Sequence, residues 1–96
     1  MNIKLQNEDE IRVKILKALA DEGRLKIIRV LYKKGEAMSC GEVGENFKLN
    51  KSTVSYHFKT LKEAGLTYTR KEGQNKFVSI RTDTFEKYLP GFLDTL

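Results

Sequence analysis

The most constraining feature of the sequence is a three-residue connection, Lys48 to Asn50, between two segments that both carry helix signals. Upstream, residues 39–42 have the S-x-x-E pattern of a capping box, which predicts a short helix from Cys40 to about Phe47. Downstream, Asn50 is a favourable N-cap for a helix from Lys51 to Ala64, and Gly65 ends it. Its apolar residues recur at helical spacing: Val54, Phe58, Leu61. Two helices joined by so short a turn predict a helix-turn-helix.

Helical patterns precede this pair, and extended patterns follow it. We expect helices over Glu8–Ala20 and Arg24–Lys34, because apolar residues recur there three and four positions apart. Residues 66–70 and 76–80 are rich in β-branched and aromatic side chains, which predicts two strands, and the polar residues 71–75 between them predict a hairpin loop.

A final helix completes the expected chain. Asp83 and Glu86 have the spacing of a second capping box, which predicts a helix through Tyr88–Leu89. Pro90 interrupts it, and residues 91–96 form a last short turn or helix. The order α-α-α-α-β-β-α describes a winged helix-turn-helix, a mainly α fold with a small β-hairpin, as one domain over residues 1–96.

The composition excludes several classes of protein. The chain has 96 residues, one cysteine and one histidine, which excludes an internal disulfide and leaves little for a metal cage or a catalytic triad. It has no glycine-rich phosphate loop, so we expect no enzyme and no cofactor. No apolar run is long enough to span a membrane, and residues 1–10 lack the apolar stretch of a secretory signal. We therefore expect a cytoplasmic protein.

The positive charge lies mostly in the middle of the chain. The net charge is +5, and residues 48–81 hold eight basic residues against Glu63 and Glu72. A basic segment between near-neutral flanks favours a polyanionic partner, although a solvated basic face would have the same composition. Since the basic segment coincides with the second helix of the pair and the hairpin, duplex DNA is the expected partner.

Two stretches of the sequence resemble a known family. Residues 19–28, LADEGRLKII, resemble the opening "LADxxRLxIL" of ArsR/SmtB-type transcriptional regulators. Residues 50–66, NKSTVSYHFKTLKEAGL, are similar to the recognition-helix signature of that family, and the resemblance extends from about residue 10 to 90. It implies a homodimeric DNA-binding repressor that an effector releases from its operator, within the nucleoid.

The recognition helix 51–64 supplies the first set of expected DNA contacts. Ser55 and Tyr56 are candidates for base contacts, since a recognition helix presents its N-terminal part to the major groove. Residues expected to hold phosphates are Lys51, Ser52, Thr53 and Lys59. The alternatives are helix capping for Ser52 and Thr53 and an incidental exposed aromatic for Tyr56. His57 is either a further contact of this helix or a partly buried, hydrogen-bonded imidazole.

The hairpin 67–81 supplies the second set, because cationic and amide side chains at a hairpin tip reach a minor groove or its phosphates. These wing residues are Arg70, Lys71, Gln74, Asn75 and Lys76. The alternative for each of them is a solvated polar loop.

The sequence departs from the metal-sensing members of the resembled family. The two cysteine positions of their C-x-C segment are occupied by Ser39 and Gly41, and Asp83-Thr84-Phe85 lacks the histidine of their D-x-H site. We therefore expect no metal site of either type. Cys40 is either a redox-responsive thiol at a helix N-terminus, where its pKa would be lowered, or a small buried side chain.

Apolar residues near both ends exceed what a trihelical core can cover. The segments at about 8–20 and 83–96 are therefore expected to form a two-fold dimer interface. Its candidate residues are Ile11, Ile15, Leu19, Tyr88, Leu89, Phe92, Leu93 and Leu96. The alternative is that these residues complete the core of a single chain. A protein-interaction module remains the rival function, because winged helices also bind proteins.

Overall fold

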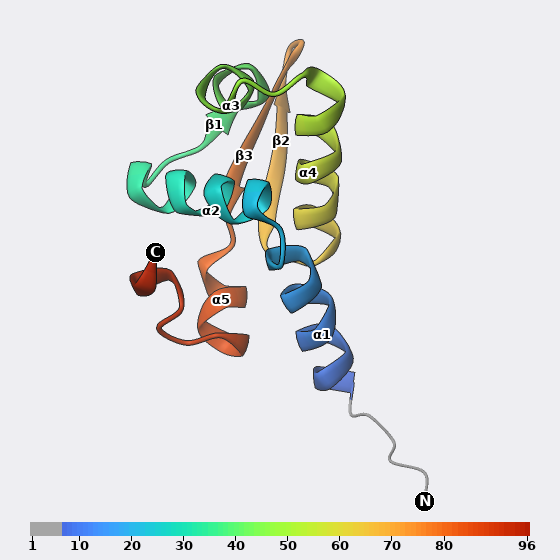
Figure 1. Ribbon diagram of the computed structural model, residues 1–96, viewed down its shortest axis with the longest axis vertical. Coiled ribbons are helices and arrows are strands. Elements are labelled where there is room, and N and C mark those ends of the chain that lie inside the picture. The colour runs from blue at the N-terminus through green and yellow to red at the C-terminus, as the bar shows by residue number, and fades with distance from the viewer. Residues whose placement is uncertain (1–6) are drawn as a thin grey trace, which may run out of the picture.

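The computed structural model describes residues 7–96 and has the winged helix-turn-helix order predicted from the sequence (Figure 1). Residues 1–6 of the expected domain lie outside the described residues. The elements are α1 Asn7–Leu19, α2 Glu22–Lys34, β1 Met38–Ser39, α3 Cys40–Phe47, α4 Lys51–Glu63, β2 Thr67–Glu72, β3 Asn75–Ile80, α5 Thr82–Tyr88 and a 3₁₀ turn, Leu93–Thr95. No helix among the described residues is long and apolar enough to cross a membrane.

The predicted caps set the geometry of the helix-turn-helix. The Ser39 hydroxyl accepts a hydrogen bond from the Glu42 amide, and the Glu42 carboxylate accepts one from the Ser39 amide, so the capping box is complete. The Asn50 side chain accepts a 2.8 Å hydrogen bond from the Thr53 amide and starts α4. Between the two helices, Lys48 takes the left-handed φ of 53° that turns the chain. The turn is therefore capped at the start of both helices.

The sheet has one strand more than the sequence predicted. β1 has only two residues, Met38 and Ser39, and pairs with Val78 and Phe77 at the edge of β3, giving the order β1-β3-β2. Two residues are too few to show a periodic pattern, which is why the prediction missed them. The strand anchors the start of α3 to the hairpin.

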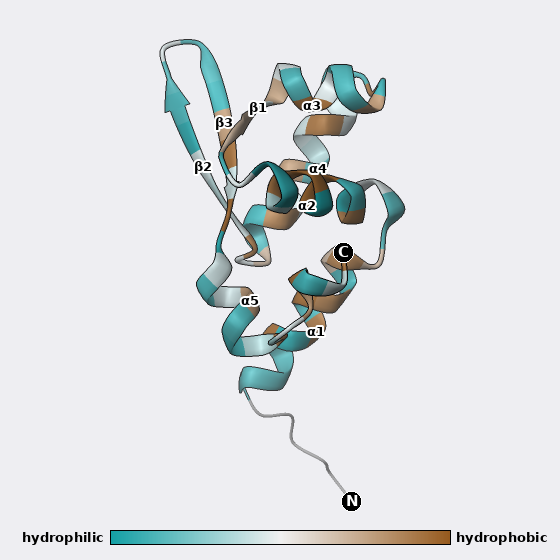
Figure 2. Cartoon of the chain, turned by 90° about the vertical axis from the view of Figure 1, so that its left-hand side faces the viewer, coloured by the Kyte–Doolittle hydropathy of each residue, from teal (hydrophilic) through white to brown (hydrophobic). Residues whose placement is uncertain are grey.

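The hairpin is longer than expected. β2 and β3 remain paired as far as Glu72 and Asn75, so the predicted five-residue loop is wrong and only Gly73 and Gln74 form the turn. The favoured two-residue turns need a positive φ at their first residue, and Gly73 has a φ of 59°. Of the polar residues predicted as loop, Lys71, Glu72 and Asn75 are therefore strand residues of a hairpin whose outer part is hydrophilic (Figure 2).

The predicted capping box at Asp83 is also wrong. α5 begins at Thr82, and Arg81 holds the N-cap position without a side-chain cap. Strand β3 runs to Ile80, and the Arg81 amide still donates to the Leu66 carbonyl at 2.9 Å. Because the end of the strand sets the start of α5, Asp83 lies inside the first turn and pairs with Arg81 instead.

The core lies between the helices and the inner face of the sheet. On α4 the predicted apolar face is fully inward, with Val54, Phe58 and Leu61 at most 2% exposed. They pack with residues from every layer of the fold, among them Ile15, Ile27, Ile28, Val43, Leu66, Val78 and Phe85. Burying one side of α4 in this way leaves its opposite side facing solvent.

Some of the residues expected at a dimer interface serve the core of the single chain instead. Ile15 and Leu19 are 1% and 7% exposed, and Leu93 is also buried. By contrast, Ile11 is 40% and Leu16 is 52% exposed on the outer side of α1. Helices α1 and α5 lie side by side at the end of the molecule opposite the hairpin tip (Figures 1 and 2).

Candidate nucleic-acid interface

The outward side of α4 carries polar and cationic side chains. Its exposed residues are Lys51, Ser52, Ser55, Tyr56, Lys59 and Lys62, together with the final Glu63, while Thr53 is half-buried. Tyr56 stands furthest out, with 62% of its surface exposed. The helix thus brings the predicted phosphate contacts and the predicted base contacts to the surface, with the one carboxylate at its far end.

The hairpin adds a second cationic surface. All five predicted wing residues, Arg70, Lys71, Gln74, Asn75 and Lys76, are exposed. Lys71 and Lys76 are direct cross-strand partners, an arrangement in which like charges destabilise a sheet. Arg70 is partly neutralised, because Glu72 lies 3.3 Å from its Nε atom. An anion bound at the tip would relieve the lysine repulsion.

His57 does not lie on this surface. It is 9% exposed, and its Nδ1 atom accepts a hydrogen bond from the Arg24 guanidinium at 3.4 Å. Burial lowers the pKa of His57, and the positive charge of Arg24 acts in the same direction, whereas Asp21 opposes it from 3.9 Å. Of the two readings of His57 from the sequence, its position supports the hydrogen-bonded imidazole.

Arg24 is the residue that the sequence reasoning missed. Its Nε atom donates a 2.6 Å hydrogen bond to the Ala18 carbonyl at the end of α1, while its Nη1 atom reaches His57. The guanidinium also lies 5.9 Å from the centre of the Tyr56 ring. One side chain of α2 therefore contacts the end of α1 and two neighbouring residues of α4.

Asp21 and Gly23 complete this junction. The Asp21 carboxylate caps α2 by accepting from the Arg24 amide at 3.0 Å, which lowers the pKa of Asp21. A Cβ atom on Gly23 would stand only 2.9 Å from Nε2 of His57, so the imidazole packs against a backbone that has no side chain. The Asp-x-Gly-Arg pattern of residues 21–24 was the only sign of this junction in the sequence. It could not show that Arg24 contacts His57, which lies 33 residues away.

Cys40 lies half-buried at the start of α3. Burial raises the pKa of its thiol, and nearby Lys76 offsets this in part. The surroundings therefore act against the lowered pKa expected from the helix N-terminus. Among residues 7–96, no three side chains of the metal-binding types gather into a cluster.

Comparison with known proteins identifies the family. A family model described as a helix-turn-helix domain matches residues 19–67. An HTH-type transcriptional regulator of Bacillus subtilis, YceK, is 63% identical over 95% of this chain and 91% of its own length. An arsenical resistance operon repressor of Staphylococcus xylosus is 37% identical over 85% of this chain and 76% of its own. The chain belongs to the ArsR family of winged helix-turn-helix transcriptional regulators. The predictions of a DNA-binding regulator and of a non-enzymatic function are thereby confirmed.

Further similar proteins extend the comparison. The transcriptional activator HlyU of Vibrio cholerae is 35% identical over 83% of this chain and 73% of its own. A solved structure of HlyU superposes with a TM-score of 0.77, covering 95% of this chain and 92% of that chain at 29% identity. The homodimeric winged helix-turn-helix domain Mb0332 of Mycobacterium bovis has the same fold, with a TM-score of 0.77, 21% identity and coverage of 99% and 88%. The relatives of this chain thus include one protein named as a repressor and one named as an activator.

We predict that Gly23→Ala destabilises the regulator by about 1–3 kcal/mol, because its methyl group would collide with the His57 ring. In the His57→Ala background the ring is gone, so the same change should cost little, and alanine is also the better helix former. Urea unfolding of the four proteins measures this coupling. Equal costs of Gly23→Ala in both backgrounds would contradict the contact.

We also predict that stability falls between about pH 7 and pH 5 through His57. Its pKa is lower in the folded chain than its ordinary value of 6.5, so the unfolded chain takes up the proton first and protonation favours unfolding. The stabilisation is complete above that value and decreases as the pH falls below it. Urea midpoints across this range should vary less in His57→Gln. Carboxylates with lowered pKa, such as Asp21, act at more acid pH.

Proposed function

We propose that this regulator binds a pseudo-palindromic duplex operator as a homodimer, with α4 in the major groove and the β2–β3 hairpin on the minor groove or its backbone. The observation that carries the proposal is the shared exposure of the α4 polar side and the hairpin, where Lys71 stands opposite Lys76. A pair of like charges costs stability in the free protein, and phosphates would neutralise it.

The contacts divide by chemistry. Ser55 and Tyr56 are placed to meet base edges, since a hydroxyl reads donors or acceptors and the Tyr56 ring can meet a thymine methyl group. The side chains proposed to hold phosphates are Lys51, Ser52, Thr53 and Lys59, with Arg70, Lys71, Gln74, Asn75 and Lys76 from the wing. His57 is proposed to act indirectly, because it lies beneath Tyr56 and is bound to Arg24.

The dimer is proposed to form through α1 and the C-terminal segment. Leu16, Ile11 and Val13 are more than a third exposed on α1. Partly buried apolar residues continue this surface on the C-terminal side: Tyr88, Leu89, Phe92 and Leu96. The similar Mb0332 domain is a homodimer, and a two-fold interface here would place two copies of α4 about one DNA turn, roughly 34 Å, apart.

Repression is the proposed mode of regulation, supported by the arsenical repressor and by the transcriptional repressor SdpR of Bacillus subtilis among the relatives. We propose that control does not use the thiolate metal site of the family, because Ser39 and Gly41 occupy its two cysteine positions and one thiolate cannot complete a cage. Binding to the chromosome would place the protein in the cytoplasm with the nucleoid.

The DNA interface predicts a measurable salt dependence and a sequence preference. About four phosphate contacts per subunit would give a log–log salt slope near −7 for a dimer. Fluorescence anisotropy with the DNA upstream of the gene and with a shuffled duplex should show preference for the first. In Ser55→Ala/Tyr56→Ala, we expect about 1–3 kcal/mol less discrimination and an almost unchanged slope.

Tyr68→Ala is the matched control, since Tyr68 is another exposed tyrosine, 52% against 62% for Tyr56, that lies outside α4 and stacks on Arg81. It should keep the discrimination. If both duplexes bind weakly and equally, a selection from a random-sequence pool follows. If that selection also yields no preferred site, the proposed function is contradicted and a protein partner is favoured.

The dimer surface predicts that Leu16→Glu yields a folded monomer that binds DNA weakly, because it places a charge on exposed apolar surface. Ile15→Glu, in contrast, should unfold the chain, since Ile15 is 1% exposed in the core of one subunit. Sedimentation measures the mass and so shows whether each variant is a monomer or a dimer. Circular dichroism shows whether each variant is folded. A folded dimer in Leu16→Glu would contradict this interface, and Lys17→Glu, on the same helix, is the control for added charge.

A further inference from the structure

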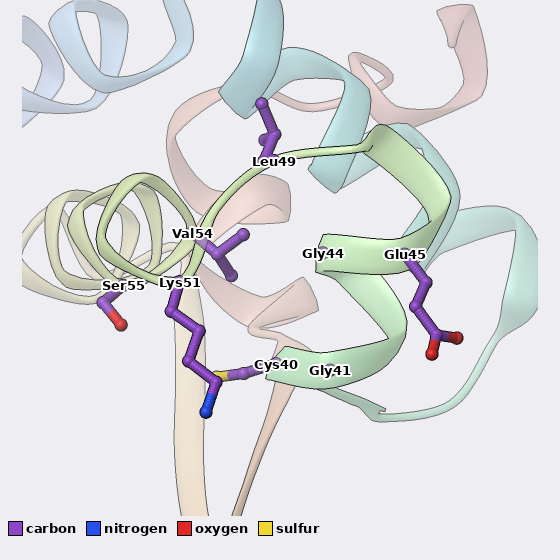
Figure 3. Close-up of a pocket in the computed structure, with 8 residues that line it drawn as sticks. All are labelled: Cys40, Gly41, Gly44, Glu45, Leu49, Lys51, Val54 and Ser55. Carbon is purple, nitrogen blue, oxygen red and sulfur yellow. The ribbon is translucent and has the colours of Figure 1, made fainter.

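A cavity of about 450 Å³ opens between α3 and α4, the two helices of the helix-turn-helix (Figure 3). Both helices and the turn between them contribute to its lining: Cys40, Gly41, Gly44, Leu49, Lys51 and Val54. A volume of this size falls in the range of small-molecule sites. Ser55, a proposed base contact, lies at its edge, so the cavity adjoins the DNA-reading surface.

Two glycines in α3 leave this space open. The helix has only eight residues, and glycine destabilises a helix relative to alanine. At Gly41 an added Cβ would meet only the Ser39 hydroxyl, at 3.8 Å, and at Gly44 the nearest atom is the Leu49 carbonyl oxygen, at 3.4 Å. Neither glycine has a positive φ. Neither tight packing nor backbone conformation therefore requires glycine at position 41, where a side chain would occupy the cavity wall.

The lining combines apolar surface with one cation. Val54 is buried and Leu49 half-buried, and the Cys40 thiol is kept protonated because burial raises its pKa. Lys51 lines the cavity from the start of α4, whereas the Glu45 side chain projects from α3 on the other side of the view (Figure 3). A single negative charge would be attracted to Lys51, and a second charge on the same molecule would meet the Glu45 carboxylate.

We infer that the cavity is a binding site for a small organic monocarboxylate with an apolar body, its carboxylate paired with Lys51 and its body against Leu49 and Val54. Because Lys51 and Ser55 are also proposed DNA contacts, such a ligand and an operator compete for the same side chains. The competition rests on the proposed function, whereas binding of the carboxylate does not.

Nuclear magnetic resonance titration of the full chain without DNA tests the site. Hexanoate and benzoate are the probes, and hexanamide and benzamide are their neutral counterparts. We expect saturable shifts of the Gly41 and Gly44 amide signals, with the carboxylates binding at least about tenfold more tightly than the amides. Lys51→Met should remove that preference. The inference would be overturned if no saturable shifts appeared up to about 10 mM carboxylate. It would also be overturned if Lys51→Met preferred the carboxylates over the amides as strongly as the wild type does.

Two leucine substitutions on α3 separate cavity filling from effects on the helix. Gly41→Leu adds a side chain at the cavity wall, and leucine favours the helix over glycine. The melting temperature should not fall, while carboxylate binding weakens at least about tenfold. Asn46→Leu, at an exposed position of α3 outside the cavity, should bind like the wild type. Equal weakening in both variants would contradict the proposed location.

Duplex binding then distinguishes this inference from the proposed function. Carboxylate should weaken duplex binding by the wild type and have no such effect on Gly41→Leu. Carboxylate binding in a protein that binds no duplex would support the site and contradict the proposed function. Duplex binding without carboxylate binding would support the proposed function and contradict the proposed carboxylate site.

Discussion

The position of α4 relative to α1 and α2 depends on one guanidinium group, that of Arg24. Arg24 belongs to α2, yet it binds the Ala18 carbonyl near the end of α1 and the imidazole of α4, so it links three helices to one another. A hydrogen bond from a charged donor is stronger than one between neutral groups, and the shielding of His57 from water strengthens this one further. The His57 ring packs so closely against Gly23 that no side chain would fit between them. This close contact restricts how α2 and α4 can pack against each other. The position of Tyr56 on the surface follows from this buried contact beside it.

The exposed surface of the hairpin includes a pair of like charges that lowers the stability of the free protein. Lys71 and Lys76 face each other across the hairpin, and the two-residue turn at Gly73 holds the strands together although their side chains repel. Sheet pairing with β1 at the other edge of β3 fixes the base of the hairpin to the start of α3. The hairpin is therefore paired on both sides of β3, and its unfavourable charge pair is one that an anionic partner would neutralise.

Local chemistry explains what the sequence could predict, and contacts between distant elements explain what it could not. The starts of α3 and α4 were predicted correctly because Ser39 and Asn50 cap their own helices within three residues. The capping box at Asp83 failed because a strand, ending at Ile80, set where α5 begins. The interior position of His57 depends on Gly23 and Arg24, which lie more than thirty residues away. Helical spacing placed Ile15 on the apolar side of its helix, but spacing alone does not say whether the residues that cover this side belong to the same chain or to a second copy.

Each side of α4 has a different neighbour, and this links the proposed activities. Val54, Phe58 and Leu61 are in the core, His57 meets α2, Tyr56 and Lys59 face solvent, and Lys51 borders the cavity beside α3. A tightly packed helix transmits displacement rather than absorbing it, since the interior has little free volume. The Ala18–Arg24–His57 contacts join α1 to α4, and Lys51 joins α4 to the cavity. Dimer formation, ligand binding and DNA binding are therefore expected to be coupled in this small domain, because all three involve contacts of the same helix, α4.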